Sequence, residues 1–152
     1  MRTAISLVAV PVLMAAGAIS AAEPGLPPYA KEACKFPAGY TIGAKTPPQF
    51  KKYTGVYVGK YDVGLLHTQV VTDISADGSA AMMVAVDNYP RWGVSRGCWA
   101  LKGTFRNGVL SRTHQSGATL EYVYSSSGDT MRFTRRSSRN VTSGTLKKTA
   151  SR

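Results

Sequence analysis

Residues 98–114 read CWALKGTFRNGVLSRTH and contain the clearest signal for the fold of this chain. In their first half, Trp99, Leu101 and Phe105 alternate with smaller or polar residues, as in a strand with one buried face. The Asn-Gly pair at 107–108 tolerates the positive φ angles of a tight type I′ turn. We therefore predict a β-hairpin that turns at this pair, with Trp99 in the hydrophobic core.

The same pattern, in which short strand-like runs are separated by turn residues, continues in both directions from this hairpin. Successive runs start about ten residues apart, which is typical of an antiparallel sandwich or barrel. Short connections favour an up-and-down order, and closure of the sheet removes its exposed edges. We therefore predict an all-β fold, a single antiparallel up-and-down barrel of about eight strands after an irregular Pro-rich N-terminal segment. The strands are expected at residues 53–61, 66–74, 79–87, 98–105, 109–114, 118–125, 130–136 and 141–148.

Alternation within these runs predicts which side chains share one face of the sheet. The expected same-face sets are Thr68, Val70, Thr72 and Ile74; Met82, Val84 and Val86; Leu120, Tyr122 and Tyr124; and Met131 with Phe133. A barrel of about eight strands is just wide enough to be filled by side chains or to hold one small ligand. The sequence leaves both alternatives open.

The part of the chain before the strands divides in two. Residues 1–22 combine a positive start, an apolar run over 4–18 and a small-residue cleavage site, which predicts a secretory signal peptide. We expect an exported mature chain without a transmembrane segment, in the periplasm or outside the cell. Six of the eight prolines lie within residues 23–50, which predicts an ordered coil with one or two helical turns. The β-barrel domain is expected to span residues 51–152.

The chain has two cysteines, Cys34 in the Pro-rich segment and Cys98 at the start of the predicted hairpin. In an exported protein, two cysteines most simply form one disulfide. By the chain-entropy argument, a loop of this length stabilises the fold by about 4 kcal/mol. Neither cysteine belongs to a Cys-x-x-Cys motif or has a histidine at metal-ligand spacing. We therefore predict a disulfide that pins the Pro-rich coil to the barrel.

Several segments together resemble a small β domain of exported bacterial proteins, which can stand alone or beside a hydrolase domain. The resemblance rests on YTGVYVGKYDVGLLHTQVV, DGSA, YPRWGV, GTFRNGVL, SGATLEYVY and SGTLKK, and it covers residues 53–148. The layout is also similar to that of lipocalin-like barrels, although the Gly-x-Trp of the first lipocalin strand is Gly55-Val56-Tyr57 here. The resemblance implies a barrel and brings no activity or catalytic residue to this chain.

No set of residues in the sequence has the spacing of a catalytic or metal site. A serine hydrolase would need His67 or His114 beside a serine and a carboxylate, and no Gly-x-Ser-x-Gly elbow occurs. Asp77 and Asp129 lie in turn sequences, and Glu121 is expected to pair with a basic residue across strands. We therefore predict a non-catalytic protein without a metal or cofactor.

The chain is strongly basic. Removal of Arg2 with the signal peptide leaves a net charge of +10, from +11 for the whole sequence. The C-terminal region carries Arg132, Arg135, Arg136, Arg139, Lys147, Lys148 and Arg152. These residues form either a solvated surface that maintains solubility or a patch for an anionic envelope component. Arg135 shares the inward face of Phe133, and we expect it at the barrel mouth, stacked on a tyrosine such as Tyr57.

The connection between the third and fourth predicted strands is the longest in the strand region and contains Tyr89, Arg91 and Trp92. Aromatic rings and guanidinium groups on loops of a rigid scaffold are typical of sugar and peptide sites. Trp92 is either a cover over the end of the barrel or a ligand contact. We predict a ligand site at this end formed by Tyr89, Arg91, Trp92, His67 and Arg135.

These observations predict an exported binding module for a small or envelope-derived ligand: a glycan, a lipid or an anionic group. The alternative is a basic protein–protein module, such as an inhibitor that inserts a loop into the acidic cleft of an envelope or host hydrolase. Export, and the lack of interleaved aromatic residues in the basic C-terminal segment, argue against nucleic acid as a partner. The sequence does not determine the oligomeric state.

Overall fold

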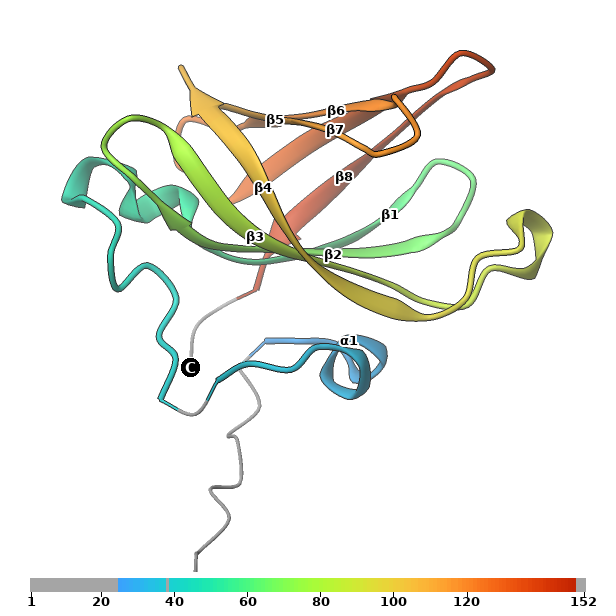
Figure 1. The fold of residues 1–152 in the computed structure, drawn as a ribbon, viewed down its shortest axis with the longest axis horizontal. Helices are drawn as coiled ribbons and strands as arrows, with labels where there is room; N and C mark the ends of the chain where they lie inside the picture. Colours follow the sequence, from blue (N-terminus) through green and yellow to red (C-terminus); the bar gives the residue numbers. More distant parts are fainter. Residues whose placement is uncertain (1–24, 38, 150–152) are drawn as a thin grey trace, which may run out of the picture.

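The computed structural model describes residues 25–37 and 39–149, and the predicted signal peptide at 1–22 lies outside these ranges. Within them, eight antiparallel strands form a closed barrel in which each strand pairs with the next and the last pairs with the first (Figure 1). The strands are β1 (Gly55–Tyr61), β2 (Leu66–Ile74), β3 (Ser79–Val86), β4 (Gly97–Arg106), β5 (Val109–Thr113), β6 (Thr119–Tyr124), β7 (Thr130–Arg136) and β8 (Val141–Lys148). The predicted all-β up-and-down barrel is confirmed.

Short helices accompany the strands. The α-helix α1 (Pro28–Ala33) and the 3₁₀ helix η1 (Pro48–Tyr53) precede the barrel, and the 3₁₀ helix η2 (Pro90–Trp92) lies in the β3–β4 connection. α1 is the helical turn that the Pro-rich segment allows. In the described part of the chain, no helix is both long and apolar enough to span a membrane.

The β4–β5 hairpin turns where the sequence predicts. Asn107 and Gly108 have φ angles of 50° and 76°, the positive values that a type I′ turn requires. The two strands then separate soon after the turn. The last paired residues of β4 and β5 are Thr104 and Ser111. β4 remains paired with β3 from Thr104 back to Gly97 (Figure 1). The barrel wall therefore has a seam between β5 and the first half of β4.

The barrel interior contains a hydrophobic core to which all the strands contribute. The shared faces predicted for β3, β6 and β7 are confirmed and point inward, with Met82, Val86, Leu120, Tyr122, Tyr124, Met131 and Phe133 buried there. Gly144 on β8 makes room for one of these side chains. A Cβ atom at Gly144 would lie 2.6 Å from the Phe133 ring, so only glycine allows the ring to pack at this point.

The single face predicted for Thr68, Val70, Thr72 and Ile74 of β2 is wrong. Val71 and Ile74 face the interior, whereas Val70 packs on the outside of the barrel. The register against β3 shifts between Val71 and Asp73, and such a bulge changes the face that the following residues occupy. Because α1 covers its outer face, β2 is buried on both sides and hydrophobic alternation does not distinguish them.

The segment before the barrel forms a strap across the outer wall (Figure 1). An apolar cluster joins it to β1, β2 and β3 and includes Leu26, Tyr29, Ala30, Val56, Val70 and Ala85. The Tyr29 hydroxyl lies 2.6 Å from the Thr68 hydroxyl of β2. The predicted disulfide between Cys34 and Cys98 is confirmed and fastens the strap to β4.

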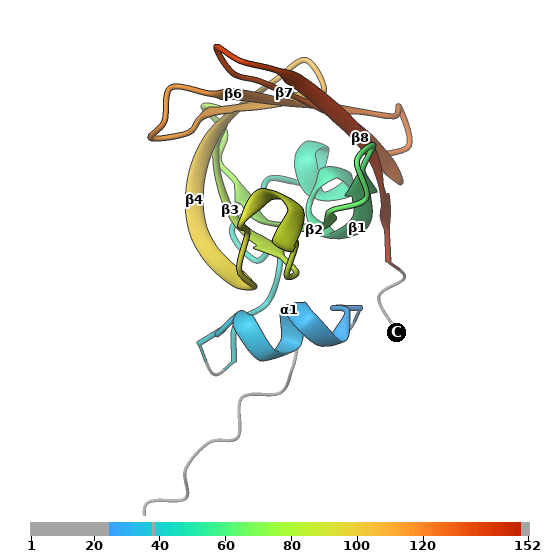
Figure 2. The ribbon, with the colours of Figure 1, turned by 90° about the vertical axis from the view of Figure 1, so that its right-hand side faces the viewer.

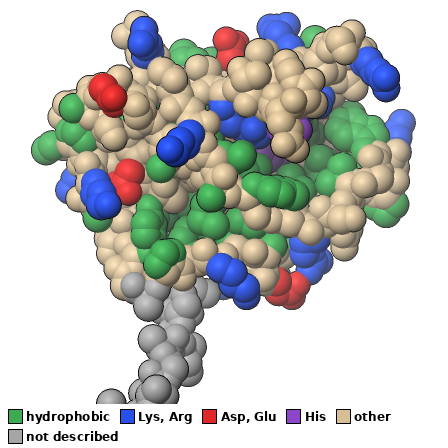
Figure 3. Space-filling model, in the orientation of Figure 1, with side chains coloured by type: hydrophobic (Ala, Val, Ile, Leu, Met, Phe, Trp, Pro, Cys, Tyr) green, Lys and Arg blue, Asp and Glu red, His purple; other side chains and the backbone are tan. Residues whose placement is uncertain are grey.

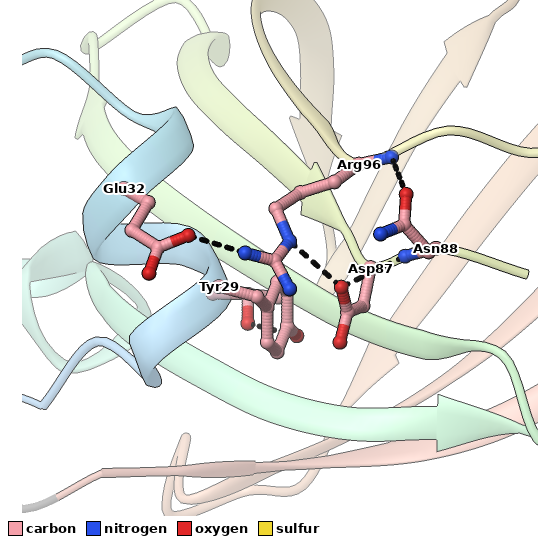
Figure 4. Close-up of polar contacts among 6 residues, drawn as sticks. Tyr29, Glu32, Asp87, Asn88 and Arg96 are labelled. Carbon is pink, nitrogen blue, oxygen red and sulfur yellow. Dashed lines mark hydrogen bonds and ion pairs between the residues drawn. The ribbon is translucent and has the colours of Figure 1, made fainter.

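A cluster of polar contacts ties the same strap to the β3–β4 loop (Figure 4). Arg96 forms an ion pair with Glu32 of α1, and its Nε donates to Asp87 Oδ1 at 2.8 Å. The Arg96 backbone N–H donates to the Asn88 side-chain oxygen at 2.8 Å. Hydrogen bonds from the Asn88 backbone N–H and from Arg96 lower the pKa of Asp87. The cluster therefore fixes the base of the loop against the barrel.

The two ends of the barrel differ. One end is closed by η1, whose Phe50 and Tyr53 rings lie 5.4 and 4.8 Å from the ring of Phe105. Tyr53 also contacts the ring of Tyr124 at 5.1 Å. Figure 2 views the opposite end, with the β3–β4 loop in the foreground and η1 behind the strands. Tyr61, His67 and Trp99 line a cavity at this opposite end, which we call the open end.

Candidate functional site

The open end contains a cavity of about 410 Å³ next to the seam between β4 and β5. The apolar part of its wall is formed by Tyr61, Val84, Val86, Trp99, Leu101 and Leu120. The polar part is formed by His67, Arg112, Thr113, His114, Gln115 and Arg135. Figure 3 shows histidine and basic side chains in a hollow bordered by hydrophobic ones. The interior is therefore filled by side chains over part of its length and hollowed at the open end.

Trp99 belongs to this cavity rather than to the core, so the prediction of a core tryptophan is wrong. It occupies the inward face of β4, as alternation requires, but it remains 50% exposed. The reason is the seam: Trp99 pairs with Val84 of β3, and β5 has already separated from β4 at this level. An inward side chain beside an open seam lines the entrance.

His67 lies on the cavity wall and is only 1% exposed. Its ring stacks on Phe133 with a centroid separation of 5.1 Å and meets the edge of Tyr61 at 5.4 Å. Neither ring nitrogen has a hydrogen-bond partner among the described residues. Burial, reinforced by the nearby Arg112 cation, lowers the pKa of His67 to about 3. The imidazole is therefore neutral at neutral pH, with one donor and one acceptor unused.

Two arginines enter the cavity from strands that flank β6. Arg112 of β5 and Arg135 of β7 both pair with Leu120, from its two sides. Their backbones are therefore roughly 10 Å apart, twice the spacing between strands. The wall residues described above include no acid, so the site carries two positive charges without an internal counter-ion. Both arginines lower the pKa of His114 at the rim, after the larger effect of burial.

Arg112 is missing from the residues that the sequence analysis assigns to the site. The signal for it exists, because alternation from the core residue Leu110 places Arg112 on the inward face of β5. A basic residue in a short strand nevertheless fits a surface position equally well. Only the register across β6 shows that Arg112 and Arg135 meet in one cavity.

The predicted contact of Arg135 with Tyr57 is wrong, although Arg135 does lie at the mouth of the barrel. Tyr57 is near the closed end, where its hydroxyl donates to the Gly128 carbonyl at 2.8 Å. The ammonium of Lys148, not Arg135, lies 5.6 Å from its ring. The tyrosine that lines the cavity with Arg135 is Tyr61.

The loop residues predicted for the site lie at the rim of the open end, outside the cavity wall. The Tyr89 hydroxyl donates to the Val63 carbonyl of the β1–β2 connection at 2.6 Å. Trp92 is 40% exposed, and its ring contacts those of Tyr61 and Tyr89 at 6.4 and 5.4 Å. Arg91 directly precedes Trp92 in η2 and is exposed. Of the five predicted residues, the structure thus brings His67 and Arg135 together in the cavity.

The geometry of the histidines and acids bears on catalysis and metal binding. His114 accepts or donates a hydrogen bond with Ser116 at 2.8 Å in an exposed turn, and no described contact joins either histidine to a carboxylate. Asp77 accepts from the Ser79 backbone N–H at 2.9 Å, as expected for a turn former. No group of three or more potential metal ligands occurs among residues 25–37 and 39–149.

The predicted ion pair of Glu121 is wrong. Its cross-strand neighbours are Ser111 on β5 and Thr134 on β7, neither of which is charged. Both ion pairs found in the described residues involve Arg96 instead. A shift of register by one residue decides which side chains face each other across strands, and the sequence pattern does not specify it here.

We expect the protein to lose stability in acid because of His67. The pKa of His67 is about 3 in the folded chain and 6.5 in the unfolded reference, so below pH 6.5 only the unfolded chain gains the proton. The stability that neutral His67 contributes is present in full above pH 6.5. As the pH falls from 6.5 toward 3, the free energy of unfolding decreases by about 1 kcal/mol per pH unit. Urea unfolding at several pH values measures this slope. H67L should flatten it, whereas an unchanged slope in H67L would contradict the assignment; H114Q is the surface control.

Comparison of this chain with models of protein families, with curated proteins and with solved structures finds no match.

Proposed function

We propose that this protein is an exported, non-catalytic binding protein that holds one small, largely apolar molecule in the open end of its barrel. The observation that carries the proposal is the cavity of about 410 Å³. Sites for small molecules typically have volumes of roughly 300–1,000 Å³, walls that are mostly apolar and a few polar groups that orient the ligand. The disulfide between Cys34 and Cys98 supports export, because such bonds persist in oxidising compartments.

The structure of the barrel suits this role. The wall is made of paired strands and η1 closes the far end, so the cavity exists before a ligand arrives. A preformed site avoids the entropic cost of ordering on binding. The seam between β4 and β5 adds a lateral entrance beside Trp99 and Leu101. Among the ligand classes that the sequence allows, the apolar wall favours a lipid-like molecule over a glycan.

The alternative role, an inhibitor with an inserting loop, receives less support. Such an inhibitor would present Arg91 at the tip of the β3–β4 loop to an acidic cleft. In this protein the loop is held against its own barrel, by the hydrogen bond of Tyr89 to Val63 and by the contact of Trp92 with Tyr61. A loop fixed at its tip as well as its base is poorly placed to enter a partner.

We expect the uncharged fluorescent probe N-phenyl-1-naphthylamine to bind the purified mature protein with one saturable site and increased emission. Leu101→Trp should weaken binding at least about tenfold, because the larger side chain fills part of the cavity. Leu101 is half-buried beside the seam, so the barrel can accept the added volume. Fluorescence titration at constant protein concentration measures the affinity, and circular dichroism checks the fold.

Ala100→Trp is the matched control for that variant. Ala100 precedes Leu101 on β4 but is exposed on the outer face. The control adds an even larger increment of side-chain volume to the same strand and should bind the probe as the unmodified protein does. Equal loss of binding in both variants, or no saturable binding of the probe to the unmodified protein, would overturn the proposed function.

A further inference from the structure

We infer that the ligand is a small organic acid whose carboxylate binds between Arg112 and Arg135 while its apolar body occupies the rest of the cavity. The inference rests on the proposed function and specifies the chemistry of the ligand. Two observations support this inference: polar groups on the cavity wall that have no hydrogen-bond partner, and the positive charge around them.

The first observation is that buried polar atoms in the site have no hydrogen-bond partner. The Arg112 Nε atom and both ring nitrogens of His67 are buried without a hydrogen bond in the described structure. A buried polar group without a partner costs about 1–3 kcal/mol, so native proteins rarely retain one. Both residues line the cavity, where a bound acceptor reaches them. The buried donors of Arg112 and His67 therefore stay without hydrogen bonds unless a ligand supplies the acceptors.

The second observation is the uncompensated charge. Arg112 and Arg135 flank Leu120 on the same inward face, and neither takes part in the ion pairs of the described chain, which involve Arg96. Two like charges in a partly enclosed cavity repel each other, and a bound anion relieves that repulsion. Arginine holds a carboxylate through two parallel hydrogen bonds, which makes it specific for planar oxyanions.

His67 fits the same ligand. As a neutral imidazole it donates one hydrogen bond and adds no further charge. A carboxylate oxygen can accept from His67 and from a guanidinium together. The apolar part of the wall includes Trp99 and Leu101 at the seam and Val84 and Val86 on the adjacent strand β3. This division into a cationic and an apolar part selects an amphipathic acid over a neutral lipid or a cation.

The test is displacement of N-phenyl-1-naphthylamine by decanoate, decanol and decylamine at pH 7.5, where the three differ chiefly in the charge of the head group. Hydrogen bonds to charged groups contribute about 1.5–3 kcal/mol, which corresponds to a difference in affinity of about tenfold or more. We expect decanoate to bind at least tenfold more tightly than decanol, and decylamine to bind most weakly.

Two variants test whether Arg112 and Arg135 cause the preference for decanoate. Arg112→Gln and Arg135→Gln should each weaken decanoate binding about tenfold and change decanol binding less than about twofold. Arg132→Gln is the control, because Arg132 lies on β7 near Arg135 but is exposed on the outer face. It removes the same charge from the protein, so it corrects for long-range attraction of anions.

The outcomes separate this inference from the proposed function. If decanoate and decanol displace the probe equally well, or if Arg132→Gln weakens decanoate as much as the cavity variants do, the carboxylate site is overturned while the cavity remains a binding site. If the probe binds but decanoate does not displace it, the carboxylate site is likewise overturned. If the probe itself does not bind, the proposed function fails.

Discussion

Replacement of Cys34 and Cys98 by serine is expected to lower the free energy of unfolding by about 4 kcal/mol. The two cysteines are 64 residues apart in the sequence, and their bond closes a long loop that restricts the unfolded chain. In the folded protein the same bond fastens the strap to β4. Without it, α1 keeps only its apolar cluster, the Tyr29–Thr68 hydrogen bond and the Arg96–Glu32 ion pair.

Urea unfolding of the oxidised protein and of the double serine variant measures this loss directly. The barrel should still form, because the disulfide lies outside its interior, and probe binding should persist below the unfolding transition. Glu32→Gln is the control: it removes one exposed ion pair of the same strap and should cost less than about 1 kcal/mol. A loss below about 1 kcal/mol in the double variant would show that the disulfide contributes little beyond the packing of α1.

Phe133→Ala is expected to lower the free energy of unfolding by about 3–5 kcal/mol. Phe133 is 1% exposed and lies at the centre of the aromatic cluster below the cavity. Its ring contacts Tyr61 at 4.6 Å, His67 at 5.1 Å and Tyr122 at 5.8 Å. Removal of the ring leaves a hole that these rigid barrel side chains cannot close, so the cost includes a cavity term as well as lost burial.

The measurement is again urea unfolding, at pH 7.5 so that His67 stays neutral. Val123→Ala is the matched control on the neighbouring strand, because Val123 points outward and is 51% exposed; it should change stability by no more than about 0.5 kcal/mol. A cost for Phe133→Ala as small as that of the control would contradict the packing seen around the ring.

Local patterns in the sequence determine much of this fold. The Asn107-Gly108 turn, the number of strands and the shared faces of β3, β6 and β7 all follow from residues close together in the chain. They could be predicted because turn conformation and strand alternation depend on neighbouring residues. The disulfide could be predicted as well, since two cysteines allow only one intramolecular pairing.

The site depends on properties that the local patterns do not specify. The register across β6 brings Arg112 and Arg135 into one cavity, although 23 positions separate their residue numbers, 112 and 135. The separation of β5 from β4 converts Trp99 from an expected core residue into part of the cavity wall. The bulge in β2 after Val71 places Ile74 inside the barrel, although Val70, four residues earlier, packs under α1.

The sequence by itself therefore determined a disulfide-bonded barrel of antiparallel strands, and only the tertiary structure decided that one end of its interior is hollowed and where its charges meet. The physical reason is the range of the interactions. A turn or an alternating strand is encoded by a few adjacent residues, whereas a cavity results from register, closure and side-chain volume summed over all the strands of the barrel.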